Sequence, residues 1–94
     1  MNKLFLRLSL QEQILFAKRL SLLIKAGVPI VKCVTMLKDQ ANSRGSRQIY
    51  TTLIGDLQNG AFLHKSMQQF RSSFGEFAVN LVRAHALLGA THAV

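Results

Sequence analysis

The sequence predicts an all-α fold, a bundle of about five to six short antiparallel helices. Apolar residues recur at helical spacing along most of the 94 residues, and no segment alternates like a β-strand for long enough to compete. Glycine, proline and small polar residues separate these apolar runs at short intervals, as in helices joined by tight turns. Because 49% of the residues are hydrophobic, the chain can close one small core. We therefore expect a single domain over residues 1–94, with its core at about residues 9–90.

The first helix is expected to begin after Ser9 and to end before Gly27. Ser9 and Glu12 have the spacing of a capping box, in which the two side chains satisfy free backbone N–H groups. Gly27 suits the left-handed conformation that ends a helix, and Pro29 suits the first turn of the next helix. We expect this turn to be structural rather than a ligand site. One continuous half of the helix is apolar and is expected to face the core: Leu10, Ile14, Phe16, Ala17, Leu20, Leu23 and Ile24.

The next two helices are predicted at about residues 29–40 and 46–59. Each gathers its apolar residues on one face, and Gly60 ends the later one. Residues 41–45 are the most loop-like stretch of the chain. Cys33 lies in the middle of the apolar face of the earlier helix, which favours a small core residue over a nucleophile.

A short fourth helix is predicted at about residues 63–70, and residues 71–73 are expected to break it. A fifth helix covers about residues 76–88. Positions on the apolar arcs of these helices give the expected core: Phe16, Leu20, Leu23, Ile30, Leu37, Leu53, Leu57 and Leu81.

The residues that usually carry catalysis are scattered. No spacing offers the paired carboxylates of an acid/base site, because the four acidic residues lie singly on four helices: Glu12, Asp39, Asp56 and Glu76. The three histidines have no partner at helical i,i+4 spacing and no cysteine companion: His64, His85 and His92. The glycines lack the context of a phosphate-binding loop. We therefore expect no catalytic residue, no metal site, no cofactor and no enzymatic activity.

Two single polar residues receive a structural interpretation. Asp56 lies near the end of its helix, where a carboxylate is unfavourable unless it has a partner. It is therefore a candidate for a hydrogen bond to a neighbouring turn, and the alternative is a solvated side chain. His85 lies on the apolar face of the fifth helix, which favours a neutral histidine at the edge of the core.

Charge is the unusual feature of the composition. Twelve Lys and Arg against four Asp and Glu give a net charge of +8, spread over the whole length. On the polar side of the first helix, two leucines lie among three cations, and together they form a candidate interaction surface: Leu15, Lys18, Arg19, Leu22 and Lys25. Such a surface suits an acidic partner or anionic lipid headgroups. The alternative is that a neighbouring helix or a second copy of the domain covers the leucines.

Binding of two leucines to a second copy would support a weak homodimer, with a dissociation constant in the micromolar range or weaker. The +8 charge also keeps open a small basic nucleic-acid-binding domain, and a helical adaptor is a further alternative. Two observations argue against nucleic-acid binding: the aromatic residues mostly lie at core spacing, and no helix clusters Arg with Asn or Gln. No apolar run reaches the length of a membrane span or of a signal peptide core.

Four segments resemble the type II secretion system F domain. The longest is residues 15–30, which contains Ala-Gly-Val-Pro after a phenylalanine and spaced leucines. Shorter matches lie at residues 37–40 and 56–60, and Asn80 to Ala84 reads Asn-Leu-Val-Arg-Ala near the end of the domain. Ala-Gly-Val-Pro combined with Asn-x-Val-Arg-Ala is a specific pair, and the resemblance covers about residues 10–90.

The resemblance implies a platform protein of the bacterial inner membrane, used in type II secretion and type IV pilus assembly. Such proteins carry two copies of a helical cytoplasmic domain, each followed by membrane-spanning helices, and have no catalysis of their own. They are thought to couple a cytoplasmic assembly ATPase to the polymerisation of pilin-like subunits. A basic domain beside the cytoplasmic membrane surface agrees with the positive-inside rule. We therefore expect this chain to be an excised cytoplasmic domain whose partners are the ATPase and other inner-membrane assembly proteins.

One departure from the family pattern follows Arg83 and Ala84. The family usually continues Gly-Glu-x-x-Gly, whereas this chain reads His-Ala-Leu-Leu-Gly over residues 85–89. The acidic residue is missing here, and with it the basis for any contact or cation site that depends on it.

Overall fold

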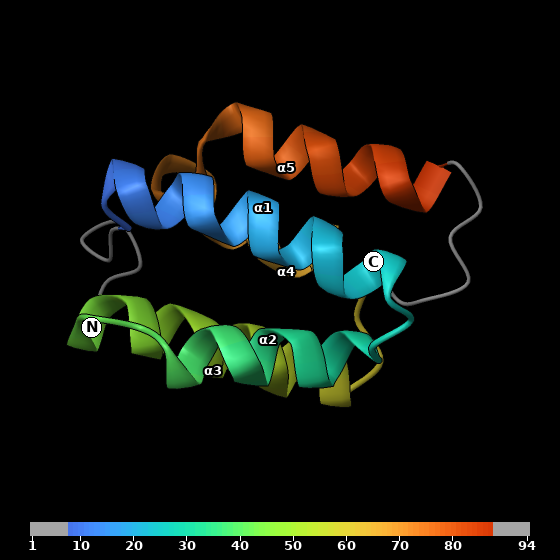
Figure 1. Cartoon of the computed structure of the whole chain (residues 1–94), viewed down its shortest axis with the longest axis horizontal. Helices are drawn as coiled ribbons and strands as arrows, with labels where there is room; N and C mark the ends of the chain where they lie inside the picture. Colours follow the sequence, from blue (N-terminus) through green and yellow to red (C-terminus); the bar gives the residue numbers. More distant parts are fainter. Residues whose placement is uncertain (1–7, 88–94) are drawn as a thin grey trace.

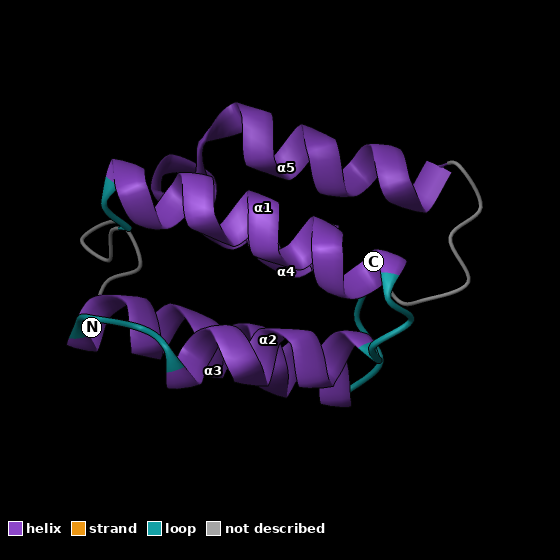
Figure 2. Ribbon diagram, viewed as in Figure 1, coloured by secondary structure: helices purple, strands orange, loops and turns teal. Residues whose placement is uncertain are grey.

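The computed structural model describes residues 8–87, and this part of the chain is helical without any β-strand (Figure 2). The elements follow in the order α1 (Leu10–Lys25), α2 (Ile30–Asp39), α3 (Arg44–Gln58), α4 (Leu63–Met67), η2 (Gln68–Phe70) and α5 (Arg71–Leu87). The predicted all-α class is confirmed. The predicted number of five to six helices is slightly too high. Among residues 8–87, four helices have ten residues or more, and α4 has only five residues, little more than one turn.

The helices pack as an up-and-down bundle with one parallel pair. α1 packs against α2 and α5, α2 against α3, and α4 against both α3 and α5. Figure 1 shows α1 and α2 running in opposite directions, whereas α5 runs beside α1 in the same direction. Three connections, after α1, α2 and α3, and the break at Gly75 separate α1 from the long part of α5. The expectation of antiparallel helices therefore fails for this pair.

α1 begins and ends as the sequence predicts. Ser9 Oγ accepts the backbone N–H of Glu12 at 3.1 Å, and Glu12 Oε1 accepts the backbone N–H of Ser9 at 3.3 Å. At the other end, Gly27 has a φ of 81°. Pro29 occupies the N-cap position of α2 instead of its first turn, so the helix begins one residue later than predicted, at Ile30.

α3 starts earlier than predicted. Arg44 and Gly45, assigned to a loop from the sequence, already belong to the helix because Ser43 caps it. Ser43 Oγ accepts the backbone N–H of Ser46 at 3.1 Å, and Ser46 Oγ accepts that of Ser43 at 3.4 Å. A serine thus takes the place that glutamate or glutamine usually holds in a capping box.

The break before the last long helix lies at Gly75, and not at residues 71–73, which are helical. Gly75 has φ 84° and ψ 155°, a conformation that side chains with a Cβ rarely adopt. A Cβ at this position would also lie 3.3 Å from Gln13 Oε1 of α1. The polar residues 71–73 predict a break, but the break needs a residue with positive φ, and that residue is Gly75.

The core lies where the apolar arcs meet. Six of the eight residues predicted for it are buried: Phe16, Leu20, Ile30, Leu37, Leu53 and Leu57. Leu23 is half-buried and packs against the core from its edge, and the side chain of Leu81 lies outside the described residues. The Phe16 ring lies 4.7 Å from that of Phe74 and 6.1 Å from that of Tyr50, between centroids, so one aromatic side chain joins α1 to α3 and α5.

Two residues of α1 assigned to the core are exposed instead. Leu10 is 72% exposed and Ile14 is 53% exposed. Both lie more than about 90° around the helix axis from the midpoint between Phe16 and Leu20, the two buried residues of α1. The described helices that flank α1 do not reach this edge, so the apolar arc of α1 is wider than the surface it packs against. Among the described residues, no helix has the length and hydropathy needed to cross a membrane.

Candidate docking groove

The structure places the five residues of the predicted interaction surface along the solvent-facing part of α1. Leu22 is 66% exposed, and no described helix covers it. Leu15 is half-buried, and the three cations Lys18, Arg19 and Lys25 are exposed. Among residues 8–87, the alternative of a covering helix therefore fails for Leu22, whereas Leu15 is partly covered.

Two adjoining hollows open beside this surface, between α1 and α2. The first has a volume of about 180 Å³ and is lined from α1 by Glu12, Leu15, Phe16 and Arg19. The second has a volume of about 220 Å³ and is lined by Arg19, Leu22, Leu23, Met36, Leu37 and Gln40. Three residues line both hollows: Arg19, Leu37 and Gln40. We call the two together the α1–α2 groove.

The far wall of the groove was not predicted from the sequence. Met36, which is 38% exposed, and Gln40 line it from α2, while Ala41, Asn42 and Tyr50 close the first hollow. The signal for this wall is weak but present: Met36 is an apolar residue of α2 that lies outside the buried face formed by Ile30, Cys33, Val34 and Leu37. Which side of α2 would meet α1 could not be read from periodicity alone.

The first hollow contains a buried phenol between two opposite charges. Tyr50 is 4% exposed, and its pKa is raised to about 12, chiefly by burial. The negative charge of Glu12 contributes to this rise, and the positive charge of Arg19 opposes it. Both charged groups therefore lie close enough to act on the Tyr50 hydroxyl, and they line the same hollow.

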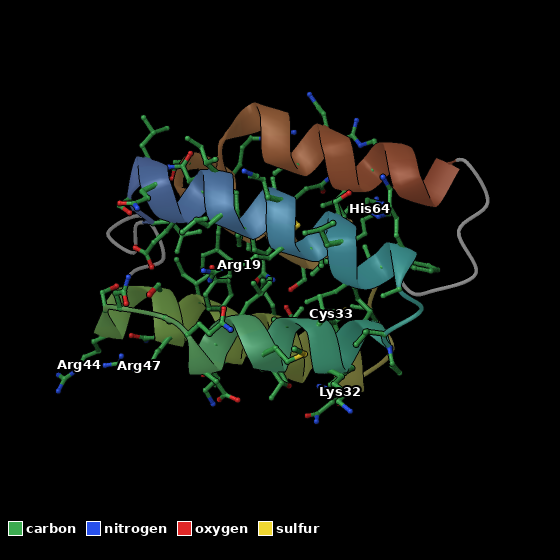
Figure 3. The ribbon with its side chains drawn as sticks, viewed as in Figure 1. Arg19, Lys32, Cys33, Arg44, Arg47 and His64 are labelled. Carbon is green, nitrogen blue, oxygen red and sulfur yellow. The ribbon has the colours of Figure 1, made fainter. Side chains whose placement is uncertain are left out.

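Arg19 extends from α1 toward α2 at the centre of the groove (Figure 3). Within residues 8–87 its guanidinium has no hydrogen bond or ion pair. Lys18 and Lys25 add two exposed positive charges to the same helix. The groove thus combines apolar walls with an unpaired cation, which is a surface suited to an apolar ligand segment bearing negative charge.

Among the described residues, exposed large apolar side chains are most numerous on α1, and of those on α1 only Leu22 lines the groove. Five large hydrophobic residues are exposed in the described part of the chain, and three of them lie on α1: Leu10, Ile14 and Leu22. Met36 adds a fourth across the groove, and Phe62 lies elsewhere, before α4. A helix that is apolar on both its inner and outer faces usually has a partner on each.

The other singled-out residues are structural. Cys33 is fully buried, its Sγ donates to the Val28 carbonyl oxygen at 3.4 Å, and burial raises the pKa of the thiol. The prediction of a core cysteine is confirmed. Asp56 accepts hydrogen bonds from Ser66 Oγ at 2.6 Å and from Gln69 Nε2 at 2.7 Å, which confirms the predicted bond to a neighbouring turn.

Among the described residues, no group of three metal-ligating side chains comes together. His64 is half-buried and stacks on Phe62, with 6.1 Å between ring centroids. The side chain of His85 and all of His92 lie outside the described residues, so the interpretation of His85 as a core-edge histidine stays a prediction.

Comparison with protein-family models gives one decisive match. Residues 16–92 match the model of the type II secretion system (T2SS) protein F family. This chain belongs to that family. The match begins at Phe16 and covers most of the groove-forming part of α1 together with all of α2, which agrees with the segments that carried the resemblance. Membership indicates a non-catalytic platform domain of a secretion or pilus system. No curated protein and no solved structure gave a significant match.

Proposed function

We propose that this protein F family domain is a non-catalytic cytoplasmic domain of an inner-membrane platform protein. In this role it links an assembly ATPase to the polymerisation of pilin-like subunits in type II secretion or type IV pilus assembly. The single observation that supports the proposal is the family match over residues 16–92. The net charge of +8 is consistent with a position beside an anionic cytoplasmic membrane surface.

The α1–α2 groove supports a role in protein contacts rather than chemistry. Its walls offer exposed apolar area and the cation of Arg19, and Glu12 is the one acidic residue among the lining residues described. The partners proposed are the assembly ATPase and other inner-membrane assembly proteins. Weak self-association through Leu15 and Leu22 is a further, minor contact.

Gene deletion and complementation in the bacterium that encodes the protein test this function. Deletion is expected to abolish secretion of the type II substrates or the display of surface pili. The full-length protein should restore that output, and a version lacking residues 16–92 should not. Full activity of the truncated version, or no defect in either output after deletion, would contradict the proposal.

A salt titration separates the proposed function from nucleic-acid binding. Binding to several phosphates weakens steeply with salt, because condensed counterions are released on binding. We expect the domain to show only weak, salt-sensitive DNA binding without sequence preference. Tight binding that survives physiological salt would favour the nucleic-acid alternative instead.

A further inference from the structure

We infer that the α1–α2 groove receives one amphipathic helix of a partner protein, with an acidic side chain of that helix opposite Arg19. This inference rests on the proposed function and deepens it, since it states the chemistry of the segment that the assembly machinery would present. Three features of the groove support it: its shape, its apolar walls and its unpaired charge.

The shape and walls fit a helix. Two roughly antiparallel helices border the groove, and its α1 lining residues run from Glu12 to Leu23, a length of about 16 Å or three helical turns. Leu22 and Leu23 line the second hollow from α1, and Met36 and Leu37 line it from α2. A helix-in-groove complex buries an apolar stripe with i, i+3, i+4 and i+7 spacing between such walls.

The charge selects an acidic helix over a second copy of this chain. Arg19 lines both hollows and has no hydrogen bond or ion pair among the described residues. The carboxylate of Glu12 lines only the first hollow, so Arg19 is the one charged residue described in the lining of the second hollow. Lys18 and Lys25 lie exposed on α1 outside the two linings. A second copy would bring a further +8 and the same cations to the interface, so like-charge repulsion opposes it. A glutamate or aspartate on the bound helix would instead form a charge-assisted hydrogen bond with the guanidinium.

A lipid surface fits the groove less well. The apolar side chains Leu22 and Met36 lie on two different helices on either side of a hollow, whereas an interfacial helix buries the apolar face of one helix in a flat layer. The concave part of the surface would therefore stay unfilled on a membrane. Anionic lipid is accordingly an outcome for the experiment to exclude.

Binding of designed peptides to the complete chain tests the inference by fluorescence anisotropy. The probe is an amphipathic peptide of about four helical turns, with leucines on one stripe and glutamates flanking it. A second peptide carries lysine in place of every glutamate, and a third has the acidic composition scrambled so that no stripe forms. We expect the acidic amphipathic peptide to bind at least about tenfold more tightly than either of the others.

Variants of the chain locate the binding site. Leu22→Ser and Met36→Ser should each weaken binding of the acidic peptide by about fivefold or more, and Arg19→Glu should favour the lysine peptide over the glutamate peptide. Leu10→Ser is the matched control, because Leu10 is an equally exposed leucine of α1 that lines neither hollow. Arg44→Glu is the control for charge, because Arg44 lies exposed on α3, at the lower left in Figure 3, and lines neither hollow. Thermal unfolding of each variant verifies that it folds.

Three outcomes would overturn the inference. One is an equal loss of binding in Leu10→Ser and Leu22→Ser, which would show unspecific apolar adhesion. Another is self-association tighter than peptide binding, which would assign the groove to a second copy. The third is displacement of the acidic peptide by vesicles containing phosphatidylglycerol, which would assign the groove to lipid.

Complementation separates this inference from the proposed function. A full-length protein carrying both Leu22→Ser and Met36→Ser is expected to fail in secretion or pilus assembly while accumulating normally. Full output from this double variant would overturn the groove assignment and leave the platform function intact. Peptide binding in a protein whose deletion affects neither output would overturn the platform function and leave the groove assignment intact.

Discussion

Gly27 turns the chain from α1 to α2 with a φ of 81°, where an L side chain is strained. A Cβ at this position would meet no atom within 4 Å, so the cost of a side chain comes from the backbone alone. Gly27→Val is therefore expected to destabilise the domain by about 1–3 kcal/mol, measured as a lower thermal midpoint.

Gly55 provides the matched control for this substitution. It also has open space around its Cβ position, but it lies inside α3 with helical dihedral angles. Gly55→Ala should stabilise the domain by about 0.5–1 kcal/mol, because alanine restricts the unfolded chain and favours the helix. An unchanged midpoint in Gly27→Val would show that α1 can end without the left-handed conformation.

Tyr50 makes stability depend on pH in the alkaline range. Its pKa is raised from 10.0 to about 12 in the folded state. Between these values the folded chain keeps the proton that the unfolded chain releases, so stability is fully present below about pH 10 and falls as pH rises toward 12. The loss amounts to at most roughly 3 kcal/mol.

Tyr50→Phe provides the reference, because it lacks the titrating group while keeping the ring. As pH rises from about 9 to 12, the unfolding free energy of the parent should fall relative to that of Tyr50→Phe. Tyr50 is the only tyrosine and the chain has no tryptophan, so tyrosinate absorbance reports its pKa directly. Glu12→Gln should lower that pKa, and titration near 10 in the folded parent would contradict the buried position of Tyr50.

At the scale of single residues, sequence reasoning succeeded where one residue type has one strong structural use. Ser9 with Glu12 predicted a capping box, and Gly27 predicted a positive φ. Asp56 predicted a hydrogen bond, because a carboxylate near the C-terminal end of a helix is unfavourable without a partner. It failed for Leu10 because apolar character does not reveal where the packing partner ends.

At the scale of elements, α3 is anchored through the middle of its apolar face. Leu53 is 0% exposed and lies at the centre of the core cluster. Leu53→Ala is expected to cost about 2–5 kcal/mol, from lost transfer free energy and the cavity left behind. Chemical denaturation measures it, with Thr51→Ala, an exposed position of the same helix, as the control. An alanine variant as stable as the parent would refute the helix register.

The carboxylate of Asp56 fastens the end of α3 to α4 and η2. Loss of its two hydrogen bonds, from Ser66 and Gln69, destabilises the domain. Loss of a negative charge near a helix C-terminus has the opposite effect and stabilises it by about a few tenths of a kcal/mol. Asp56→Ala should therefore destabilise the domain by about 1–3 kcal/mol in denaturant titrations. Asp39→Ala, at an exposed carboxylate of α2, should change stability by no more than about 0.5 kcal/mol, and equal effects of the two would contradict this assignment.

Element type was predictable from periodicity, whereas element boundaries depended on backbone details. The capping of α3 by Ser43 and Ser46 departs from the usual Ser-x-x-Glu pattern, and for this reason the sequence predicts a loop where the first turn of α3 lies. The break at Gly75 was placed a few residues early, because three polar residues resemble a turn more than one glycine does. The positive φ of Gly75 and the closeness of Gln13 Oε1 explain why a glycine occupies this position.

At the scale of the whole molecule, the charge sets a limit on self-association. Burial of Leu15 and Leu22 contributes roughly 3–6 kcal/mol before the costs of association. Two copies of a chain with a net charge of +8 repel each other, so we expect a dissociation constant in the micromolar range or weaker, which decreases as salt screens the charge. Sedimentation over a range of concentrations should show less dimer for the Leu15→Ser, Leu22→Ser double variant. Equal association by parent and double variant would remove these leucines from the contact.

The α1 side of the groove was predictable because Leu15 and Leu22 lie outside an apolar arc that already fills the core. The α2 side was not, because Met36 and Gln40 become neighbours of Arg19 only after the α1–α2 turn sets the angle between the helices. A surface built from two elements depends on their packing, and single-helix periodicity contains no record of that packing.

Burial of Cys33 has a practical consequence for chemical labelling. It is the sole cysteine of the chain, fully buried, and burial raises the pKa of its thiol, so little reactive thiolate reaches a reagent while the domain stays folded. A cysteine introduced at exposed Lys18 or Lys25 would therefore react with maleimide dyes without replacement of the native one. The folded domain therefore accepts spectroscopic probes on the exposed face of α1 with its native cysteine in place.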